Sequence, residues 1–383
     1  MSGDPEQEYF ADGMVEDIIS ALSRFTSLFV IARNSSFTYK GRAVDIKQVG
    51  RELGVRYVLE GSVRKSGSRV RITGQLIEAA NGSHLWADKI DGALDDVFDL
   101  QDKVTRQVVG AIAPSVERAE IERTRQKPTV TAYDWYLRGV ELHNLPKRET
   151  QTKALEMFRR AIEADPSFAS AYAAAIVPYM VRAAYGWFSD PTDLAEAVQF
   201  ARKAIELDQD DPFVLARAGY SLVAFGGEDE KGRGLLEKAL RFNPNLAWPQ
   251  AWSGLCRVWN GEYRESVECF EIFMRLNPLD PYSFLGPNGL AQAYFFLGEP
   301  AECRKFAELA VRAASDASAV LQVDILSLVV VSKINEAKQK FVNLTKINPK
   351  LADANGFRLR SIFRRCRDIE KVIEAFRHAG LSE

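Results

Sequence analysis

A six-residue phrase recurs through the last two thirds of this chain and constrains its fold more than any other sequence feature. An apolar residue pair is followed two residues later by Asp-Pro or Asn-Pro, at Ala161–Pro166, Ala239–Pro244, Phe273–Pro278 and Leu344–Pro349, with a looser copy at Ala204–Asp208. The copies begin 43, 35, 34 and 71 residues apart, and the last step is about twice 35, which places a degenerate copy at Glu308–Ala313. A fixed period of this length indicates a repeat architecture.

A period near 34 residues resembles the tetratricopeptide repeat, in which each unit is a pair of helices. We expect each phrase to end the second helix of a pair, because proline has no N–H and cannot continue a helix. Glycines mark the turns inside the pairs, at Gly226-Gly227, Gly261 and Gly298. Since one pair cannot bury its apolar face alone, the units are expected to stack into a superhelical solenoid. An ordinary helical bundle is the alternative.

Composition limits the partners that this chain can have. Its 383 residues allow two or more domains, and 50 basic against 52 acidic residues give a formal net charge of −2. This balance gives no general electrostatic reason to bind nucleic acid or an anionic membrane. The most apolar stretch, Val320–Val331, is short and contains Asp324, so it is read as a buried repeat helix and not as a membrane span. We therefore expect a cytoplasmic protein without a membrane segment.

The cysteines predict no metal site and no disulfide framework. Cys256, Cys269, Cys303 and Cys366 are scattered through the repeats without CxxC spacing, and the chain has only three histidines. They are interpreted as reduced thiols that mostly serve packing.

The first 115 residues follow different periods. Met14, Ile18, Leu22 and Phe25 mark one face of a helix, and Leu28–Ile31 is read as a short buried strand after it. Asp45–Leu53 predicts a second helix that ends at Gly54.

An antiparallel meander is predicted next. Strands over residues 57–64, 69–76 and 84–89 are separated by turns at Lys65–Ser68 and Asn81-Gly82. A long amphipathic helix follows, with Asp95 or Asp96 at its start. These elements predict an α/β domain over residues 1–115, a charged helical extension and linker over 116–130, and a repeat array of about six units with a carboxy-terminal cap over 131–383. The charged end of the long helix, Glu117–Lys127, is read as a solvated face.

Several stretches carry a resemblance to a known type of protein. Gly3–Gly13, Val30–Ser35 and Glu52–Val63 are similar to a TolB-like amino-terminal domain, and Thr131–Gly139 resembles the entry to its repeat array. His378–Glu383 resembles the end of the cyclase-linked members. In bacteria, rhizobia especially, the resemblance implies a region that follows a class III adenylate/guanylate cyclase domain or a winged-helix DNA-binding domain. The resemblance covers essentially the whole chain, and it includes neither the cyclase domain nor the winged-helix domain.

One departure from that pattern concerns the beginning of the chain. Members usually have an apolar strand just before the Gly-Asp-Pro-Glu stretch, whereas here Met1 lies two residues ahead of Gly3. Either translation begins upstream, or the chain is separate from its catalytic end. A sheet without this strand exposes an unpaired edge, so we expect residues 1–115 to be poorly soluble alone.

The motif search predicts no catalytic residue, cofactor or metal site. The chain has no Walker phosphate loop, HExxH, GxSxG or strand-linked GxGxxG motif. Phe10–Gly13 superficially resembles a metal-binding cyclase strand, but Asp12 is better explained as a cap at a helix start. The remaining candidates are interpreted as solvated or capping acids and as packing or isolated histidines, namely Asp95, Asp96, Asp99, Asp102, His84, His143 and His378.

Two groups of residues are candidates for binding. Aromatic residues of the array are the usual anchors of a groove, although packing between helices explains many of them: Trp187, Trp248, Trp252, Trp259, Tyr263 and Tyr294. The densest basic patch is a weak nucleic-acid signal and is better read as a solvated final helix: Arg358, Arg360, Arg364, Arg365 and Arg367.

The sequence thus predicts a small α/β TolB-like domain followed by an all-α tetratricopeptide-like superhelical solenoid. The favoured function is a non-catalytic interaction or sensory module that binds a protein or peptide partner and regulates a cyclase. The alternatives are the carboxy-terminal part of an active cyclase and the accessory region of a winged-helix transcription regulator. No nucleic-acid partner is expected, and self-association is left open.

Overall fold

The computed structural model divides the chain into two compact units, Met1–Pro128 and Thr129–Glu383. It describes residues 5–23, 28, 30–31, 33–42, 44–66, 69–93, 97–124, 131–187, 192–244, 246–276, 281–355 and 362–382. The two units are described separately below.

The first unit is built on an antiparallel sheet of three strands in the order β1-β2-β3 among the described residues. The strands are β1 (Tyr57–Ser66), β2 (Arg69–Glu78) and β3 (Ser83–Ala93), as the meander predicts. Tyr57 pairs with Glu78, Arg69 pairs with Ala93, and a register shift lies between Leu76 and Ile77. Val70, Ile72 and Leu76 are buried on one face of β2, which confirms the alternation read from the sequence.

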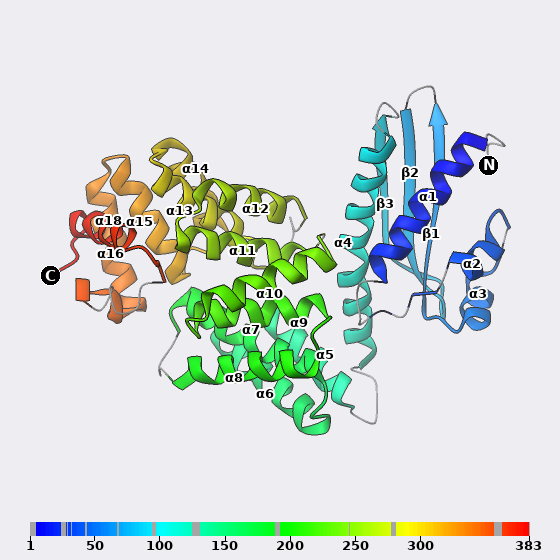
Figure 1. Cartoon of the computed structure of the whole chain (residues 1–383), viewed down its shortest axis with the longest axis horizontal. Helices are drawn as coiled ribbons and strands as arrows, with labels where there is room; N and C mark the ends of the chain where they lie inside the picture. Colours follow the sequence, from blue (N-terminus) through cyan, green and yellow to red (C-terminus); the bar gives the residue numbers. More distant parts are fainter. Residues whose placement is uncertain are drawn as a thin grey trace. The chain divides into compact units, whose positions relative to one another are not determined.

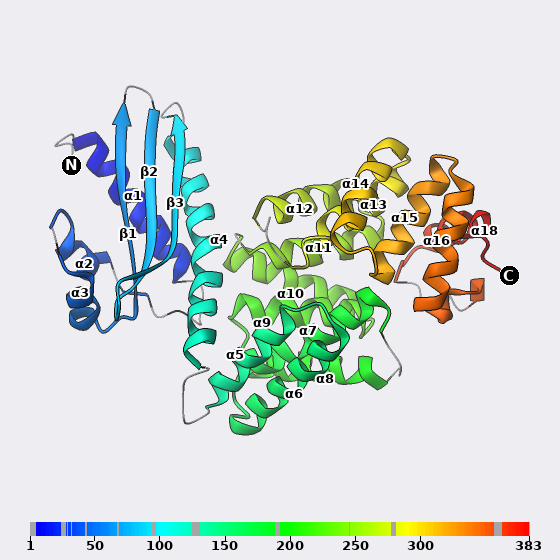
Figure 2. The same ribbon diagram turned by 180° about the vertical axis from the view of Figure 1, so that it is seen from behind.

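Two helices cover one face of this sheet (Figures 1 and 2). They are α1 (Pro5–Leu22) and α4 (Val97–Thr124), and their apolar faces bury Met14, Val104 and Val108. The short helices α2 (Arg33–Ser36), η1 (Phe37–Tyr39) and α3 (Ile46–Leu53) complete the unit. Asp45 caps α3 by accepting from the Lys47 N–H, and α3 ends at Gly54 with φ of +65°, as predicted.

Two readings of the first unit need correction. Leu28, Val30 and Ile31 belong to no strand. A strand forms only beside a hydrogen-bonded partner strand, and a run of four apolar residues does not identify such a partner. Phe25 and Phe29 lie outside the described residues. Asp12 is not at a helix start, because α1 begins at Pro5; its carboxylate pairs instead with Lys40 Nζ at 2.5 Å.

The charged end of α4 is also less solvated than its composition suggests. Glu120 is 2% exposed and accepts a hydrogen bond of 2.6 Å from the Tyr57 hydroxyl. Arg56 Nη1 lies 2.7 Å from the same carboxylate. Burial and this hydrogen bond raise the pKa of Tyr57, so the phenol stays a donor. Glu120 therefore ties the end of α4 to the start of β1.

The second unit consists of helix pairs in chain order (Figure 1). The described residues form six pairs, α5–α6, α7–α8, α9–α10, α11–α12, α13–α14 and α15–α16, followed by η2 (Pro349–Leu351) and α18 (Cys366–His378). The first helices are α5 (Ala132–His143), α7 (Ala169–Tyr185), α9 (Pro212–Ala224), α11 (Ala247–Asn260), α13 (Leu285–Leu297) and α15 (Ser318–Val330). The second helices are α6 (Arg148–Ala164), α8 (Thr192–Leu207), α10 (Asp229–Phe242), α12 (Tyr263–Leu276), α14 (Pro300–Ala313) and α16 (Ile334–Ile347).

The recurring phrase ends the second helix of each pair, as the sequence predicts. Helix α6 ends at Ala164 just before Asp165-Pro166, and α14 ends at Ala313 within the degenerate copy. Gly261 and Gly298 close the first helices α11 and α13 with φ of +84° and +77°, a conformation that glycine adopts without strain. Repeat chemistry therefore sets both turns of a unit.

Small residues let neighbouring helices approach at fixed points. Phe270 on α12 is fully buried between Gly254 of α11 and Gly289 of α13. A Cβ atom at Gly254 would lie 2.9 Å from the Phe270 ring, closer than real Cβ atoms pack. The ring thus joins two consecutive pairs in a close-packed core.

The apolar stretch Val320–Val331, predicted to be a buried repeat helix with Asp324 in it, corresponds to α15. Asp324 is 1% exposed, and its carboxylate lies 2.6 Å from Arg304 Nη1 of α14 and 3.0 Å from Lys340 Nζ of α16. The acid is therefore the meeting point of three helices.

Early and late parts of the array touch, so the stack of pairs curls tightly. The Tyr282 hydroxyl, just before α13, donates to the backbone carbonyl of His143 at the end of α5. The two rings stack with centroids 5.2 Å apart. Helix α7 also contacts α15, where Gly186 meets Ser318. This curl encloses the inner faces of the first helices.

Candidate ligand-binding cavity in the repeat unit

The inner faces of the first helices surround a cavity of about 700 Å³. Residues at helical spacing line it from consecutive first helices, α7 to α15. They are Met180 of α7, Arg217 and Tyr220 of α9, Trp248, Trp252, Leu255 and Trp259 of α11, and Leu285, Asn288 and Gln292 of α13. Gln322 and Val323 of α15 also take part. A cavity of this size can hold a drug-sized molecule or the end of a peptide.

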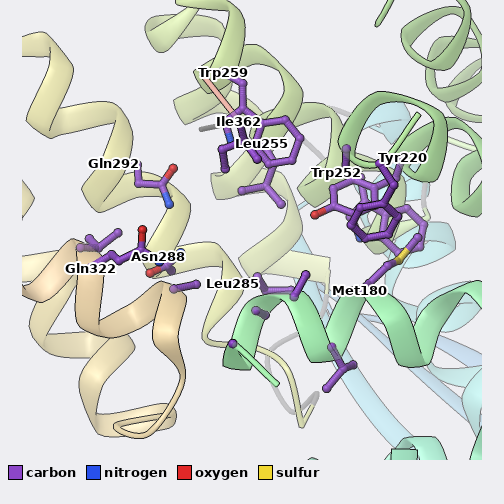
Figure 3. Close-up of a pocket in the computed structure, with 18 of the residues that line it drawn as sticks. Met180, Tyr220, Trp252, Leu255, Trp259, Leu285, Asn288, Gln292, Gln322 and Ile362 are labelled. Atoms are coloured by element: carbon purple, nitrogen blue, oxygen red, sulfur yellow. The ribbon is translucent and has the colours of Figure 1, made fainter. Parts of the chain in front are cut away.

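One wall of the cavity is aromatic. The Tyr220 ring centroid lies 5.8 Å from that of Trp252 and 5.9 Å from that of Trp259. Trp248 adds a further contact, 5.5 Å from Trp252. Figure 3 shows Tyr220, Trp252 and Met180 together on one side of the cavity. This wall favours a flat apolar group.

The opposite wall carries side-chain amides. Asn288, Gln292 and Gln322 lie on the other side of the cavity in Figure 3. Asn288 Oδ1 and Gln292 Oε1 are buried and accept no hydrogen bond within the described part of the chain. The indole Nε1 of Trp259 is likewise a buried donor without an acceptor there. Buried polar atoms are normally satisfied, so these three atoms need partners that the described chain does not supply, either water or a ligand in the cavity.

The charge of the cavity is positive or neutral. Arg217 and Arg364 line it, and no Asp or Glu does so among the described residues. Arg364 Nε is committed to Asp229 at 2.6 Å, whereas Arg217 forms no ion pair with a described carboxylate and lies 5.7 Å from the centroid of the Phe213 ring. Burial lowers the pKa of His143 to about 4, the bond to Gln151 opposes this shift, and Arg217 adds to it. His143 is therefore neutral at pH 7.

A segment near the carboxy terminus closes one side. Ile362, Phe363 and Arg364 line the cavity, and the Arg364 N–H donates to the Trp259 carbonyl at 2.9 Å. Arg364 Nη2 donates to the Val223 carbonyl at 2.8 Å, and Phe363 packs edge-on against Phe296 at 5.1 Å. We call residues 362–365 the strap.

The strap corrects the reading of the basic patch as a solvated final helix. Arg364 and Arg365 precede α18, and Arg365 bonds the Tyr263 hydroxyl and, at 2.7 Å, Asp368. Only Arg367 fits the earlier reading, with 74% of its side chain exposed. Arg358 and Arg360 lie outside the described residues. Arg364 and Arg365 therefore hold the strap in place, because nearby helices supply carboxylates and a carbonyl to them, whereas Arg367 is mostly exposed to solvent.

The structure separates the six aromatic candidates into two groups. Trp248, Trp252 and Trp259 line the cavity. The others are not among its lining residues and stack on neighbours: Trp187 on Tyr185 at 4.4 Å, Tyr263 on Phe296 at 4.9 Å and Tyr294 on Phe306 at 5.6 Å.

The remaining candidates form no chemical centre in the described residues. Asp95 and Asp96 lie outside them, the side chains of Asp99 and Asp102 are not described, and His84 is an exposed residue of β3. No described group of three or more His, Cys, Asp or Glu residues could hold a metal ion. The four cysteines are free, and burial raises the pKa of Cys256 and of Cys303 to about 12. None of the described helices is long and apolar enough to cross a membrane.

Comparison with known proteins finds two similarities, one to a family model and one to a putative cyclase. Residues 5–107 match the family model of the second domain of HilA/YgeH-like transcriptional regulators. Over 215 residues, 55% of this chain, it is homologous at 45% identity to putative adenylate cyclase 3 of Rhizobium meliloti (strain 1021). The matched part spans only 37% of the length of that relative.

Solved structures of repeat proteins are similar to the chain in fold. PilF of Pseudomonas aeruginosa has 21% identity and a TM-score of 0.40, covering 57% of this chain and 92% of its own. The Cut9–Hcn1 assembly of the APC/C gives 14% identity and a TM-score of 0.47, covering 74% and 52%. The chain combines a small sheet unit with a helical array whose paired helices resemble those of tetratricopeptide repeat proteins, and over part of its length it is a homologue of a putative adenylate cyclase.

Proposed function

We propose that this chain is a non-catalytic interaction and sensory module of a bacterial cyclic-nucleotide signalling protein, acting in the cytoplasm. The observation that carries the proposal is the 45% identity to putative adenylate cyclase 3. The helix pairs support it, because stacked pairs of this type present a continuous surface to a protein or peptide partner.

The array would act through its curl. The contact between Tyr282 and the end of α5 joins early and late pairs. A partner that packs against Trp248, Trp252 or Trp259 changes the free energy of the curled form relative to a more open one. Binding then shifts the population of the two forms, and an attached output domain responds.

A chimeric cyclase tests this function. In the rhizobial relative, the matching region is replaced by that of this chain, and cyclic AMP is measured in a cyclase-deficient bacterium. We expect the chimera to produce cyclic AMP at a level that changes at least threefold with Trp252→Ala, and we expect this chain alone to produce none. Arg367→Ala, at an exposed site, is the matched control.

Two outcomes would reject the proposal. One is cyclic AMP output that stays the same after deletion of the whole array. The other is cyclic-nucleotide synthesis by the purified chain itself.

A transcription regulator is the second candidate, favoured by the match of residues 5–107 to the HilA/YgeH-like second domain. Mass spectrometry of the amino-terminal peptide of the native protein, with the upstream reading frame, separates the two candidates. An in-frame winged helix would support the regulator, whereas an in-frame cyclase domain would support the cyclic-nucleotide proposal.

A further inference from the structure

We propose that the cavity of the repeat unit binds an aromatic or apolar carboxylate, held by Arg217 and enclosed between the aromatic and amide walls. This site does not depend on the link to cyclases, because it rests on the lining residues alone. Three properties of the cavity lead to it.

The first property is shape. Tyr220 and Trp252 of the aromatic wall lie across the cavity from the amide wall formed by Asn288, Gln292 and Gln322 (Figure 3). Rings on one side and buried amides on the other fit a ligand with an apolar body and a few hydrogen-bonding groups. The strap residue Ile362 narrows the space between them.

The second property is charge. Arg217 is the lining cation without a described carboxylate in an ion pair, since Arg364 is held by Asp229 and His143 is neutral at pH 7. The Arg217 guanidinium is partly buried at this wall, 5.7 Å from the Phe213 ring, and a bound anion would give it the ion pair that it lacks among the described residues. A carboxylate matches its forked donors, and a cationic ligand would meet repulsion with no acidic lining residue to offset it.

The third property is the set of buried polar atoms without partners. Asn288 Oδ1 and Gln292 Oε1 lie one turn apart on α13, in the amide wall, and Trp259 Nε1 belongs to the last turn of α11. An amide can rotate to offer either its oxygen or its NH₂ group, so this wall can accept from or donate to a ligand. These atoms fix the orientation of the ligand body while Arg217 fixes its charged end.

Three ligands that share one apolar body and differ in charge test the site in the full chain. We use 4-phenylbutyrate, its neutral amide and 4-phenylbutylamine, with isothermal titration calorimetry and tryptophan fluorescence as readouts. We expect the acid to bind at least tenfold more tightly than the amide and the amine to bind most weakly. The peptide acetyl-Gly-Gly-Phe carries the same carboxylate on a chain end, so its affinity relative to the free acid tells whether the source is a small acid or a peptide terminus.

Substitution of Arg217 assigns the preference to that residue. Arg217→Gln should remove the preference for the acid while leaving the affinity of the amide within about twofold, and Arg217→Lys should restore part of it. Arg241→Gln on the exposed surface of α10 is the matched control and should keep the full preference. Thermal melting shows whether each variant is folded.

The proposal would be overturned by equal affinity of acid and amide for the natural chain. Absence of heat and of any fluorescence change up to about 1 mM of every probe would also overturn it. An acid preference that persists in Arg217→Gln would place the carboxylate elsewhere and reject the assignment. Each result is independent of the cyclic AMP assay, so this site and the proposed regulatory function can fail separately.

Discussion

Two regions of the repeat unit bury polar side chains and treat them in opposite ways. Where α14, α15 and α16 meet, the carboxylate of Asp324 is held by Arg304 and Lys340. At the cavity wall, Asn288 and Gln292 keep buried oxygens that accept nothing from the described chain. A satisfied network stabilises a fold, whereas unsatisfied atoms cost stability and persist where a ligand uses them. We therefore propose that the first region serves folding and the second region serves binding.

The largest effect is expected at the satisfied network. Asp324→Ala removes the buried acceptor shared by Arg304 and Lys340. Because Arg304 keeps Glu308 at 2.9 Å and both cations keep contact with solvent, the free energy of unfolding should fall by about 3 kcal/mol. Urea denaturation of the full chain measures it. Asp316→Ala, at an exposed position before α15, is the control and should change stability by less than about 0.5 kcal/mol. A loss at Asp324 as small as that of the control would break the comparison.

The next effect concerns His143, whose ring stacks on Tyr282 and bonds Gln151 beside Arg217. Burial lowers its pKa to about 4 in the folded chain, below the value of about 6.5 in an unfolded chain. Above pH 6.5 neither state binds the proton, and between pH 6.5 and pH 4 only the unfolded state does. Stability should therefore fall as the pH falls through this window, by roughly 2 to 3 kcal/mol at pH 4.5.

Urea denaturation at pH 7.5 and pH 4.5 isolates this contribution. His143→Gln should lose that part of the pH dependence, while the exposed His378→Gln should retain it. Identical pH dependence of stability in the natural chain and in His143→Gln would contradict this prediction. It would mean that burial beside Tyr282 does not prevent protonation of His143 in the folded chain.

The strap should contribute less. Arg364→Ala removes the ion pair with Asp229 and the bond to the Val223 carbonyl. Because 30% of the Arg364 side chain is exposed and solvent screens the pair, the expected loss is about 1 to 2 kcal/mol. Hydrogen exchange of the Arg364 amide, which donates to Trp259, should quicken in this variant and stay unchanged in Arg367→Ala.

Much of the fold could be predicted from the sequence because its signals are local. The phrase that ends each second helix, the glycines after α11 and α13, and the alternation along β2 depend on residues within one turn or one strand. The predicted strand at residues 28–31 failed for the converse reason, since its existence depends on a neighbour that a short apolar run does not specify. The TolB-like resemblance, and the domain limits drawn from the change of period and the charged end of the long helix, stay predictions.

The candidate site was only partly accessible to sequence reasoning. Trp248, Trp252 and Trp259 stood out as aromatic residues, but Arg217, Asn288 and Gln292 did not, because single polar residues in a helix look like surface positions. The repeat pattern was a signal that could have found them. Arg217, Asn288 and Gln292 lie on the faces of first helices that line the same cavity as the tryptophans of α11. The contact of the strap with α11 had no such signal, since 105 residues separate Trp259 from Arg364 and only the curl brings them together.

The smallest effect on stability is expected at the cavity wall, the second of the two regions. Asn288→Leu keeps the side-chain volume and removes a buried oxygen that accepts no hydrogen bond in the described chain. Removal of such a group should leave the free energy of unfolding unchanged or raise it by up to about 1 kcal/mol, the reverse of the change at Asp324. The same variant should weaken binding of 4-phenylbutyrate and of its amide alike, because it alters the wall that orients the body of the ligand and not the cation. A stability loss above about 2 kcal/mol would mean that Asn288 serves the fold in the same way as Asp324, and the cavity wall would then lose its assignment to binding.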